Sequence, residues 1–416
     1  MSKLRTIEEV VDWRLCIGCG ACTWACREEN IRMVDLVEEG LRPVRAKTEC
    51  GDCDACLQVC PVVETPSDIL FREAQRSPNE LEKDWRRIEA IYEGHATDEN
   101  IRFRGSSGGA LSALAIYCME QLEMEGTLHI GQDHDDAIRN STRLSRTPDE
   151  VLEACGSRYS PASVCDGLEL VENASRECVI IGKPAEIAAT RKAMAMQPTL
   201  SENVGVTMSF FCAETPPTRA TKELCKNFSV DPGKVSYLRY RGLGWPGYFT
   251  TQENDLPEVE HQIYHESWAF LQSFRPWSTQ LWPDGTGELA DITCGDPWYE
   301  EPDGKNPGFS IIVARTERGK SIIEGAISSG YIAAKPAEEW KLIESQKGLL
   351  KKRASIWGRR LSAKLFRIPV TEFRNNTLYH SWKGLGIKDK LRSTLGTVRR
   401  IITRRLYKRK KSIKVS

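Results

Sequence analysis

The 416-residue sequence has no long apolar run: no stretch approaches the roughly 18 to 20 apolar residues that a membrane-spanning helix needs. Its first 13 residues are polar and charged and lack the apolar core of a secretory signal. It also lacks net charge, with 58 basic and 58 acidic side chains, and it shows no Ser-His-Asp or carboxylate constellation that calls for hydrolysis. These absences exclude a spanning protein and predict a cytoplasmic chain.

The composition indicates a folded protein of several modules. Charged residues make up 28% and hydrophobic residues 40% of the chain, which excludes disordered and collagenous classes. Single cores stop growing at roughly 250 to 300 residues, so two or three modules are expected. In a reducing compartment, 15 cysteines indicate metal ligation or redox chemistry before disulfides.

Eight of the cysteines fall in two runs near the start, and both runs read C-x2-C-x2-C-x3-C. In the bacterial ferredoxin pattern, three cysteines of a run hold one four-iron cluster and the fourth reaches the other cluster. The sequence therefore predicts two 4Fe-4S clusters. The ligands of the first are Cys16, Cys19, Cys22 and Cys60, and those of the second are Cys50, Cys53, Cys56 and Cys26.

A pair of zinc sites is the alternative, since four-cysteine zinc sites also use C-x2-C pairs. Zinc sites normally separate two such pairs by a longer loop, so the spacing favours iron-sulfur. Pro61 follows the second run as the ferredoxin pattern expects, whereas Arg27 replaces proline after the first.

The body of the chain alternates between strand and helix patterns. Residues 71–94 read as largely helical after Pro78, with Leu81, Trp85, Ile88 and Ile91 at intervals of three or four. The apolar runs GTLHIGQD, CVIIG and VGVTMSFF read as buried strands, and KPAEIAATRKAM after CVIIG reads as a turn and helix. YLRYRGLGWPGYFT, residues 237–250, reads as one loop-like segment. The alternation predicts an α/β body.

A Gly/Ser-rich loop within residues 101–110 precedes an apolar helix pattern. Glycine and serine let backbone N–H groups approach a phosphate, and the helix N-terminus with Arg102 and Arg104 adds a favourable field. The spacing matches neither dinucleotide-binding nor P-loop fingerprints, so an ordinary loop is the alternative. Lys183, between a strand and a helix, has the same two interpretations, as a ligand contact or a plain connecting turn.

Taken together, the ordered motifs resemble the coenzyme F420 hydrogenase/dehydrogenase beta-subunit family over about residues 14 to 335. They are the double ferredoxin run, RFRGSSGGALSAL, GSRYSPAS, GKPAEIAATRK, FFCAETPP, RYRGLGWPG and ELADITCGDPW. The resemblance implies an FAD- and iron-sulfur-containing oxidoreductase that moves electrons between two clusters, the flavin and a redox protein or the deazaflavin coenzyme F420. Some similar proteins are associated with polysaccharide synthesis.

The same resemblance implies a fold and a set of flavin contacts. The fold is mixed α/β: a ferredoxin-like domain at 1–66, a helical linker at 67–99, a flavin-binding α/β body in two regions at 100–180 and 181–344, and a basic helical tail at 345–416. The implied FAD contacts are Arg104, Gly105, Ser106, Ser107, Gly108, Gly109, Ser157, Arg158, Tyr159, Lys183, Pro184, Arg239, Arg241 and Gly242.

The sequence departs from the family at three positions. Where the resemblance leads us to expect cysteines that help hold a further cluster beside the flavin, this chain has Ala185, Thr279 and Trp282. Their joint replacement indicates that this cluster is absent and that Trp282 fills the vacated volume. An electron-transfer adaptor without flavin chemistry, or a scaffold with a structural metal centre, is therefore the alternative function.

The C-terminal tail is strongly basic. Residues 345–416 hold 22 Lys or Arg against Glu372 and Asp389, so the tail carries +20 and the rest of the chain −20. Basic residues at helical intervals among apolar ones predict contact with an anionic membrane surface or an acidic partner. A helix pair packed on the acidic body is the alternative. Nucleic acid is not expected as a partner, since no binding fold is evident.

Overall fold

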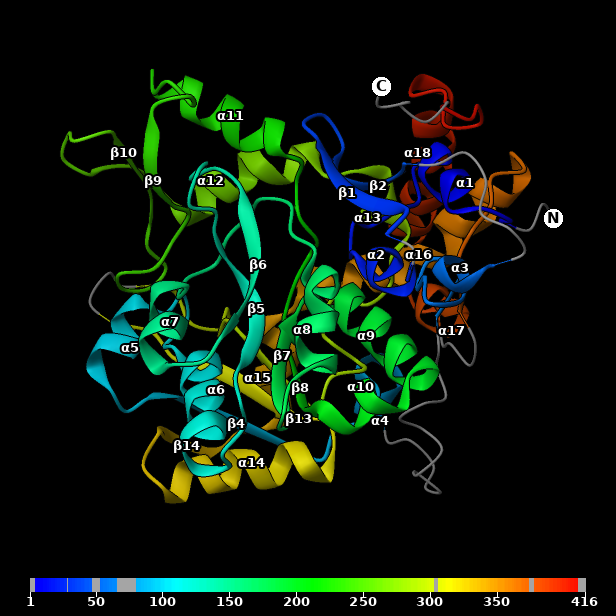
Figure 1. The fold of residues 1–416 in the computed structure, drawn as a ribbon. Coiled ribbons are helices and arrows are strands. Elements are labelled where there is room, and N and C mark those ends of the chain that lie inside the picture. The colour runs from blue at the N-terminus through cyan, green and yellow to red at the C-terminus, as the bar shows by residue number, and fades with distance from the viewer. Residues whose placement is uncertain are drawn as a thin grey trace.

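A computed structural model describes residues 4–27, 29–46, 53–65, 80–302, 306–373 and 378–410 (Figure 1). Its centre is a mixed sheet of eight strands. In spatial order they are β14 (Ile332–Pro336), β4 (Ala90–Ala96), β13 (Ser310–Ala314), β12 (Ile292–Gly295), β8 (Val204–Phe210), β7 (Cys178–Gly182), β5 (Thr127–Gln132) and β6 (Asn140–Ser145).

Five strands of this sheet run in the same direction. Strands β5, β7, β8 and β12 pair in parallel. Strand β4 is antiparallel to β13, which is itself antiparallel to β12, so β4 points the same way as β12. The carboxyl ends of all five strands therefore meet at one edge of the sheet, where ligands of open α/β sheets bind.

Helices cover both faces of the sheet because its strands are apolar on both sides (Figure 1). On β7, Val179 packs with α6 (Ala110–Gln121) and α14 (Glu317–Ser328). Its neighbour Ile180 packs with α8 (Leu168–Glu172) and α9 (Pro184–Met196) on the opposite face. The shorter helices of this body are α4 (Glu80–Trp85), α5 (Glu99–Arg104), α7 (Pro148–Glu153), η1 (Val164–Gly167), α10 (Pro198–Asn203) and α15 (Glu339–Ser345).

A second, three-stranded sheet projects beside the first. Its strands are β11 (Val259–Ile263), β10 (Tyr248–Glu253) and β9 (Val235–Arg239), all antiparallel. Phe249 and Leu238 are fully buried between this sheet and α11 (Thr218–Asn227). The helices α12 (Tyr264–Leu271), η2 (Gln272–Phe274) and α13 (Trp277–Leu281) follow and return the chain to the main sheet.

The N-terminal module has the ferredoxin-like organisation that the cysteine runs predict. Its elements are α1 (Ile7–Asp12), α2 (Ala21–Ala25), β1 (Ile31–Leu36), β2 (Gly40–Arg45), α3 (Ala55–Gln58) and β3 (Glu64–Thr65). Helix α2 packs against η1, α8 and α9 of the body. Lys192 of α9 donates hydrogen bonds to the carbonyl oxygens of Cys60 at 2.9 Å and Glu64 at 2.8 Å, which joins the module to the body.

The C-terminal region is helical and packs on the rest of the chain. It consists of α16 (Lys347–Leu365), β15 (Glu372–Phe373), α17 (Leu378–Lys383) and α18 (Ile387–Thr403). Arg353 pairs with Glu288 of the body, and Arg409 pairs with Asp12 of the N-terminal module at 3.2 Å. Part of the basic tail thus neutralises this chain's own acidic body. In the described part of the chain, no helix is both long and apolar enough to cross a bilayer.

The mixed α/β fold with a ferredoxin-like module and a helical C-terminal region is confirmed, but two local predictions are wrong. Residues 66–79 lie outside the described residues; beyond them, only Glu80–Trp85 is helical, and Ala90–Ala96 is the strand β4. Arg86 has a left-handed φ of 62° and ends the helix. Leu81, Trp85 and Ile91 nevertheless share one core cluster, so the three- and four-residue spacing reflects a common buried side.

The second wrong prediction concerns residues 237–250. These do not form one loop: β9 ends at Arg239 and β10 begins at Tyr248, so the segment is a hairpin with only 240–247 as its loop. The glycines that suggested a loop throughout lie at its turn, where Gly242, Gly244 and Gly247 have positive φ.

Candidate functional site

The predicted functional segments lie along one edge of the main sheet, at the carboxyl ends of its parallel strands. The Gly/Ser loop follows α5, which follows β4, and its Gly108 carbonyl oxygen accepts a 2.8 Å hydrogen bond from the N–H of Ala96 at the end of β4. Asp296 follows β12, Glu214 follows β8, and Lys183 follows β7. The strand order therefore puts the Gly/Ser loop toward one end of this edge and Lys183 toward the other.

The four cysteines predicted to hold the first cluster are brought together at the junction with the body. All four residues are buried, with 7 to 8% of their surface exposed: Cys16, Cys19, Cys22 and Cys60. Burial raises the pKa of the Cys22 thiol, and the neighbouring thiols of Cys19, Cys16, Cys60 and Cys56 raise it further. This convergence fits the crossed ligation of a four-iron cluster.

Backbone N–H groups also point at these thiols, as small residues between ligands allow. The N–H of Gly18 lies 3.4 Å from Cys16 Sγ. Backbone hydrogen bonds from Val63 and Val62 lower the pKa of Cys60, although burial raises it overall to about 12. Such N–H donors stabilise thiolates and tune a cluster's potential.

The cysteines predicted for the second cluster lie farther from the body. Cys56 is buried, Cys26 is half-buried and Cys53 is exposed, while Cys50 lies outside the described residues. The second cluster is therefore predicted on the outward side of the module. Among the described residues, no group of three His, Cys, Asp or Glu side chains fits a single metal ion.

The Gly/Ser loop is held by close backbone contacts that only glycine permits. Gly108 and Gly109 have φ of 75° and 67°, and a Cβ on Gly108 would lie 2.5 Å from Phe309 Cα. Gly109 precedes α6, and no side chain caps that helix N-terminus. The N-terminal N–H groups of α6 are therefore available to an anion.

Two other predicted segments, far apart in sequence, meet at this loop. The N–H of Ser157 donates a 2.6 Å hydrogen bond to Ser106 Oγ. A Cβ on Gly242 would lie 2.9 Å from the Arg104 carbonyl oxygen and 3.4 Å from Arg239 Nη1. The structure thus brings together the Gly/Ser loop, residues 156–157 and residues 239–242.

Two arginines of this cluster have no carboxylate partner among the described residues. Arg104 is exposed and donates only to Asn100 Oδ1, at 3.1 Å. Arg239 lies over the Tyr237 ring and donates to its hydroxyl, while its buried Nε has no hydrogen-bond partner in the described chain. Two free guanidinium groups beside glycine backbone and a helix N-terminus fit a diphosphate such as that of FAD.

The other predicted cations are engaged within the protein. Arg158 donates to the carbonyl oxygens of Ala137 at 2.6 Å and Leu238 at 3.0 Å. Arg241, 1% exposed, pairs with Asp296 at 2.6 Å. These arginines join the two sheets and hold the loops in place.

The Tyr159 side chain belongs to an aromatic cluster. Its ring centroid lies 4.9 Å from that of Trp268 and 5.5 Å from that of Tyr240. Tyr264, in the same cluster, stacks on Trp298 at 5.6 Å and lies 4.3 Å below the Arg241 guanidinium.

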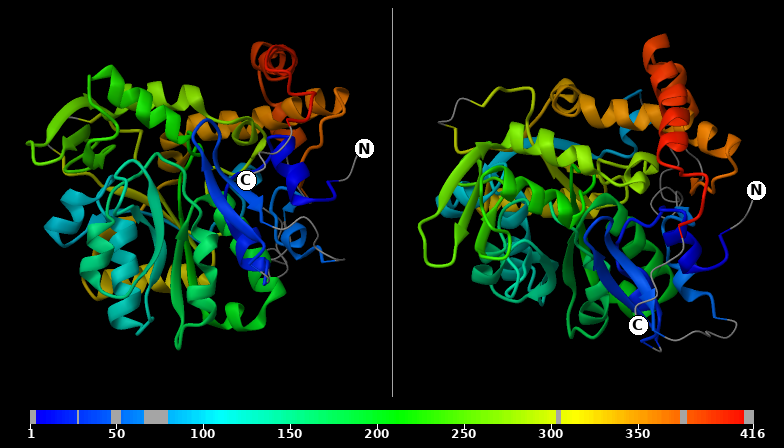
Figure 2. Two further views of the ribbon diagram at one scale, coloured as in Figure 1. Left: turned by 45° about the horizontal axis from the view of Figure 1, so that its top comes forward. Right: turned by 90° about the horizontal axis from the view of Figure 1, so that it is seen from above.

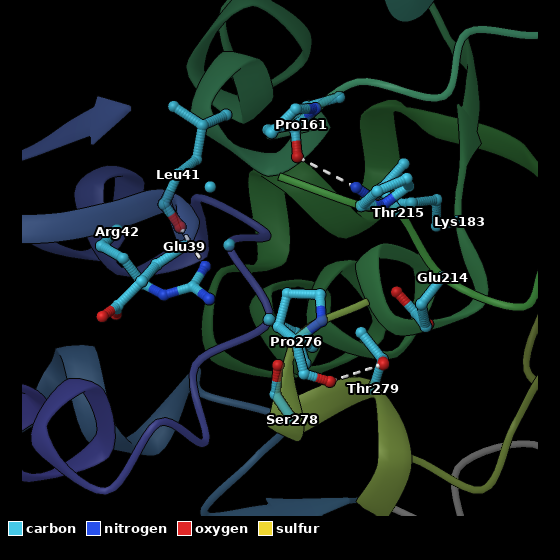
Figure 3. A pocket seen from close by; sticks show the side chains of 15 residues that line it. Glu39, Leu41, Arg42, Pro161, Lys183, Glu214, Thr215, Pro276, Ser278 and Thr279 are labelled. Carbon is cyan, nitrogen blue, oxygen red and sulfur yellow. Dashed lines mark hydrogen bonds between the residues drawn. The ribbon is translucent and has the colours of Figure 1, made fainter. Parts of the chain in front are cut away.

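Lys183 lies apart from this loop cluster, in a cavity of about 20 Å³ between the N-terminal module and the body (Figure 3). Its Nζ pairs with Glu186 at 2.9 Å and donates to the Ala162 carbonyl oxygen at 3.0 Å. Burial lowers the pKa of Lys183, but the Glu186 charge outweighs it and the pKa is raised overall. Pro184 is the buried first residue of α9. The sequence-predicted contacts therefore fall in two places.

The three positions where cysteine was expected are close to this cavity. Thr279 lines it, and Ala185 and Trp282 belong to one core cluster with Trp24 of the N-terminal module. All three are nearly fully buried, and the Trp282 ring meets Phe373 edge-on at 5.8 Å. The Trp282 indole is therefore buried in the core cluster that the module and the body share.

A buried acid and a buried amine near the cavity have polar atoms without partners in the described chain. They are Glu214 Oε1 and Lys352 Nζ. Burial raises the pKa of Glu214, against the lowering effect of Lys352 and Lys183. Burial lowers the pKa of Lys352 to about 8, and the Glu214 charge offsets only part of this lowering. Lys352 comes from α16, so the C-terminal region contributes to this buried cluster.

Sequence reasoning missed several residues that shape the loop cluster. Asp296 accepts from Arg241 and, at 3.1 Å, from Trp245 Nε1, and Trp298 stacks on Trp245 at 5.4 Å. Asp296 and Trp298 lie within the ELADITCGDPW motif, just after its buried strand Ile292–Gly295, and that position was the available signal. Cys165, whose N–H donates to the Cys19 carbonyl oxygen at 3.1 Å, carries no spacing signal.

Models of known protein families match most of this chain. The family model for the coenzyme F420 hydrogenase/dehydrogenase beta subunit matches in two parts, the N-terminal part over residues 91–169 and the C-terminal part over 175–339. The model of a 4Fe-4S dicluster domain matches residues 9–66.

Individual relatives are distant but cover much of the chain. The chain is 27% identical to the coenzyme F420 hydrogenase subunit beta of Methanococcus voltae, over 59% of this chain and 84% of that protein. It is 22% identical to the coenzyme F420-dependent sulfite reductase of Methanocaldococcus jannaschii, over 76% of this chain and 46% of that protein.

Among solved structures, a chain of the F420-reducing NiFe hydrogenase complex from Methanosarcina barkeri has a similar fold. It matches with a TM-score of 0.53 and 19% identity, over 70% of this chain and 96% of that chain. Since the two family parts and the dicluster domain follow one another in the order that the motifs predicted, the chain belongs to the coenzyme F420 hydrogenase/dehydrogenase beta-subunit family.

Proposed function

We propose that the chain is an oxidoreductase subunit that passes electrons between two 4Fe-4S clusters and FAD, with coenzyme F420 or a redox protein as the further partner. The observation that carries the proposal is the pair of arginines without carboxylate partners, Arg104 and Arg239, beside the Gly/Ser loop. Subunits of F420-dependent hydrogenase and formate dehydrogenase among the relatives support the partner class.

In this proposal each group of residues has a distinct task. Arg104, Arg239 and the N–H groups at the start of α6 bind the FAD phosphates. Bound FAD would supply the exchange between one-electron and two-electron chemistry. The Arg241–Asp296 pair orients the loop by fixing the Ser106 carbonyl oxygen, to which Arg241 donates at 2.5 Å.

The order of sites along the sheet edge supports a direction for the path. The N-terminal module meets the body near the ends of β7 and β8, next to the cysteines predicted for the first cluster, whereas the second cluster is predicted on the outward side of the module. Electrons from an outside partner would therefore enter at the second cluster and reach the body through the first. The buried cluster around Lys183 and Glu214 lies between that entry and the Gly/Ser loop.

The experiment is to purify the whole chain without oxygen and to measure its iron, its flavin and its visible spectrum. The proposal predicts about eight irons and one FAD, with clusters and flavin both reducible. Iron at that level without any retained or added FAD would overturn the flavin part. An iron-free but folded protein would overturn the proposal as a whole.

An electron-transfer adaptor without flavin is the second candidate, and one observation favours it. Ala185, Thr279 and Trp282 occupy the positions where the family resemblance led us to expect cysteines, and Trp282 is buried in the core cluster that the module and the body share. Clusters that exchange electrons with a partner protein at the same rate whether or not FAD is added would support this candidate.

A further inference from the structure

Helix α18 packs on the protein through a largely polar side. Its buried residues are Ser393, Thr397 and Ile401, so two of the three side chains that it turns inward carry hydroxyl groups. Ser393 Oγ accepts a 3.0 Å hydrogen bond from Trp382 Nε1. A Cβ on Gly358 of α16 would lie 2.5 Å from that same oxygen, so the two helices approach closely there.

The outer side of α18 is apolar instead. Four large aliphatic side chains are 52 to 78% exposed: Ile387, Leu391, Leu395 and Ile402. Their spacing of four, four and seven residues places them on one stripe of the helix. A contiguous stripe of this kind, unlike single exposed leucines, marks a surface that contacts something apolar. Figure 2 shows α18 standing at the outside of the molecule.

Charge identifies the kind of partner. The exposed side chains next to this stripe include Lys388, Arg392 and Arg399, and none of them has a carboxylate partner among the described residues. The only acid in α18, Asp389, is engaged by Lys351 of α16 at 2.9 Å. The outer face of α18 therefore combines aliphatic side chains with uncompensated positive charge.

We propose that this outer face of α18 binds the surface of an anionic lipid bilayer. An interfacial helix lies in the membrane plane, with aliphatic side chains in the acyl boundary and Lys or Arg at the headgroups. The aliphatic stripe flanked by exposed basic side chains has the composition of such an interfacial helix, and the positive charge beside it favours an anionic surface. The polar inner side, held by α16 and α17, leaves this stripe free to face outward.

The test is vesicle flotation of the full-length, anaerobically purified protein. Vesicles of phosphatidylcholine with about 30 mol% phosphatidylglycerol should bind it, and pure phosphatidylcholine vesicles should bind it at least about tenfold more weakly, because each basic residue near an anionic surface adds attraction. Binding should also fall as salt is raised.

Two variants and a matched control separate the apolar and the basic contributions. Leu391→Gln with Leu395→Gln, and separately Lys388→Gln with Arg392→Gln and Arg399→Gln, should each lower binding by at least about tenfold. Leu256→Gln should change nothing, since Leu256 is 60% exposed on a distant hairpin. All variants alter exposed side chains, so iron content and thermal midpoint should match the wild type.

Three outcomes would overturn the proposal. The first is no binding to anionic vesicles by the wild-type protein, and the second is equal binding by the stripe variants. The third is a wild-type dimer, seen by light scattering, that the stripe variants convert to a monomer, because a second copy would then cover the stripe.

Discussion

Two groups of cations along the sheet edge differ in what they contact. Arg241, Arg158 and Lys183 are buried or half-buried, and their donors are engaged by Asp296, by backbone carbonyl oxygens and by Glu186. Arg239 lies two residues before Arg241 and Arg104 lies at the same loop, but neither has a carboxylate partner in the described chain. The first group holds the loops, and the second group is available to a ligand.

This difference shows why sequence position alone could not separate structural arginines from arginines that are available to a ligand. Arg239 and Arg241 belong to the same RYRGLG motif, but Arg239 is the last residue of β9 whereas Arg241 lies in the hairpin loop. One guanidinium therefore turns into the protein and the other remains beside Gly242. Partner and burial, not motif membership, distinguish a structural arginine from one that can bind phosphate.

The largest expected effect comes from breaking a paired cation. Arg241→Met should lower the free energy of unfolding by about 3 to 5 kcal/mol, because it leaves Asp296 partly buried without its partner. Denaturant unfolding of the anaerobic protein measures this loss. Arg239→Met, two residues away, is the matched control and should cost less than about 1 kcal/mol. Equal losses in the two variants would remove the distinction between the groups.

A smaller effect of opposite sign is expected at Lys352. Its pKa is lowered to about 8 from 10.5 because it is buried without a hydrogen-bond partner in the described chain. Below pH 8 the folded protein must hold a buried charge, so Lys352→Met should be more stable than the wild type by about 1 to 3 kcal/mol.

The pH dependence of that difference follows from the direction of the shift. Between pH 8 and 10.5 the unfolded Lys352 binds a proton that the folded one has lost, so wild-type stability rises with pH in this window. The advantage of Lys352→Met should therefore shrink as pH rises from 8 to 10.5.

The paired Lys183 is the contrast: Lys183→Met should destabilise the protein at about pH 7, because Glu186 loses its partner. Stabilisation by both substitutions would contradict this account.

The sequence predicted the parts of the molecule that depend on local spacing. The two cysteine runs, the buried strands and the glycine loop before α6 follow from ligand spacing, apolar pattern and turn chemistry. It could not predict that Ile91 lies on a strand, because the apolar residues Leu81, Trp85, Ile88 and Ile91 of one core cluster recur at intervals of three or four, which also fits a helix. Nor could it place the Lys352 charge near Glu214, since these residues are more than a hundred positions apart in the chain.

The most direct measurement compares FAD affinity and stability in the same protein. Arg104→Met combined with Arg239→Met should weaken FAD binding by at least about 100-fold, because each charged contact to phosphate contributes about 1.5 to 3 kcal/mol. Iron should stay at about eight per chain, and the unfolding midpoint should match that of the wild type. A folded double variant that binds FAD as tightly as the wild type would contradict the account.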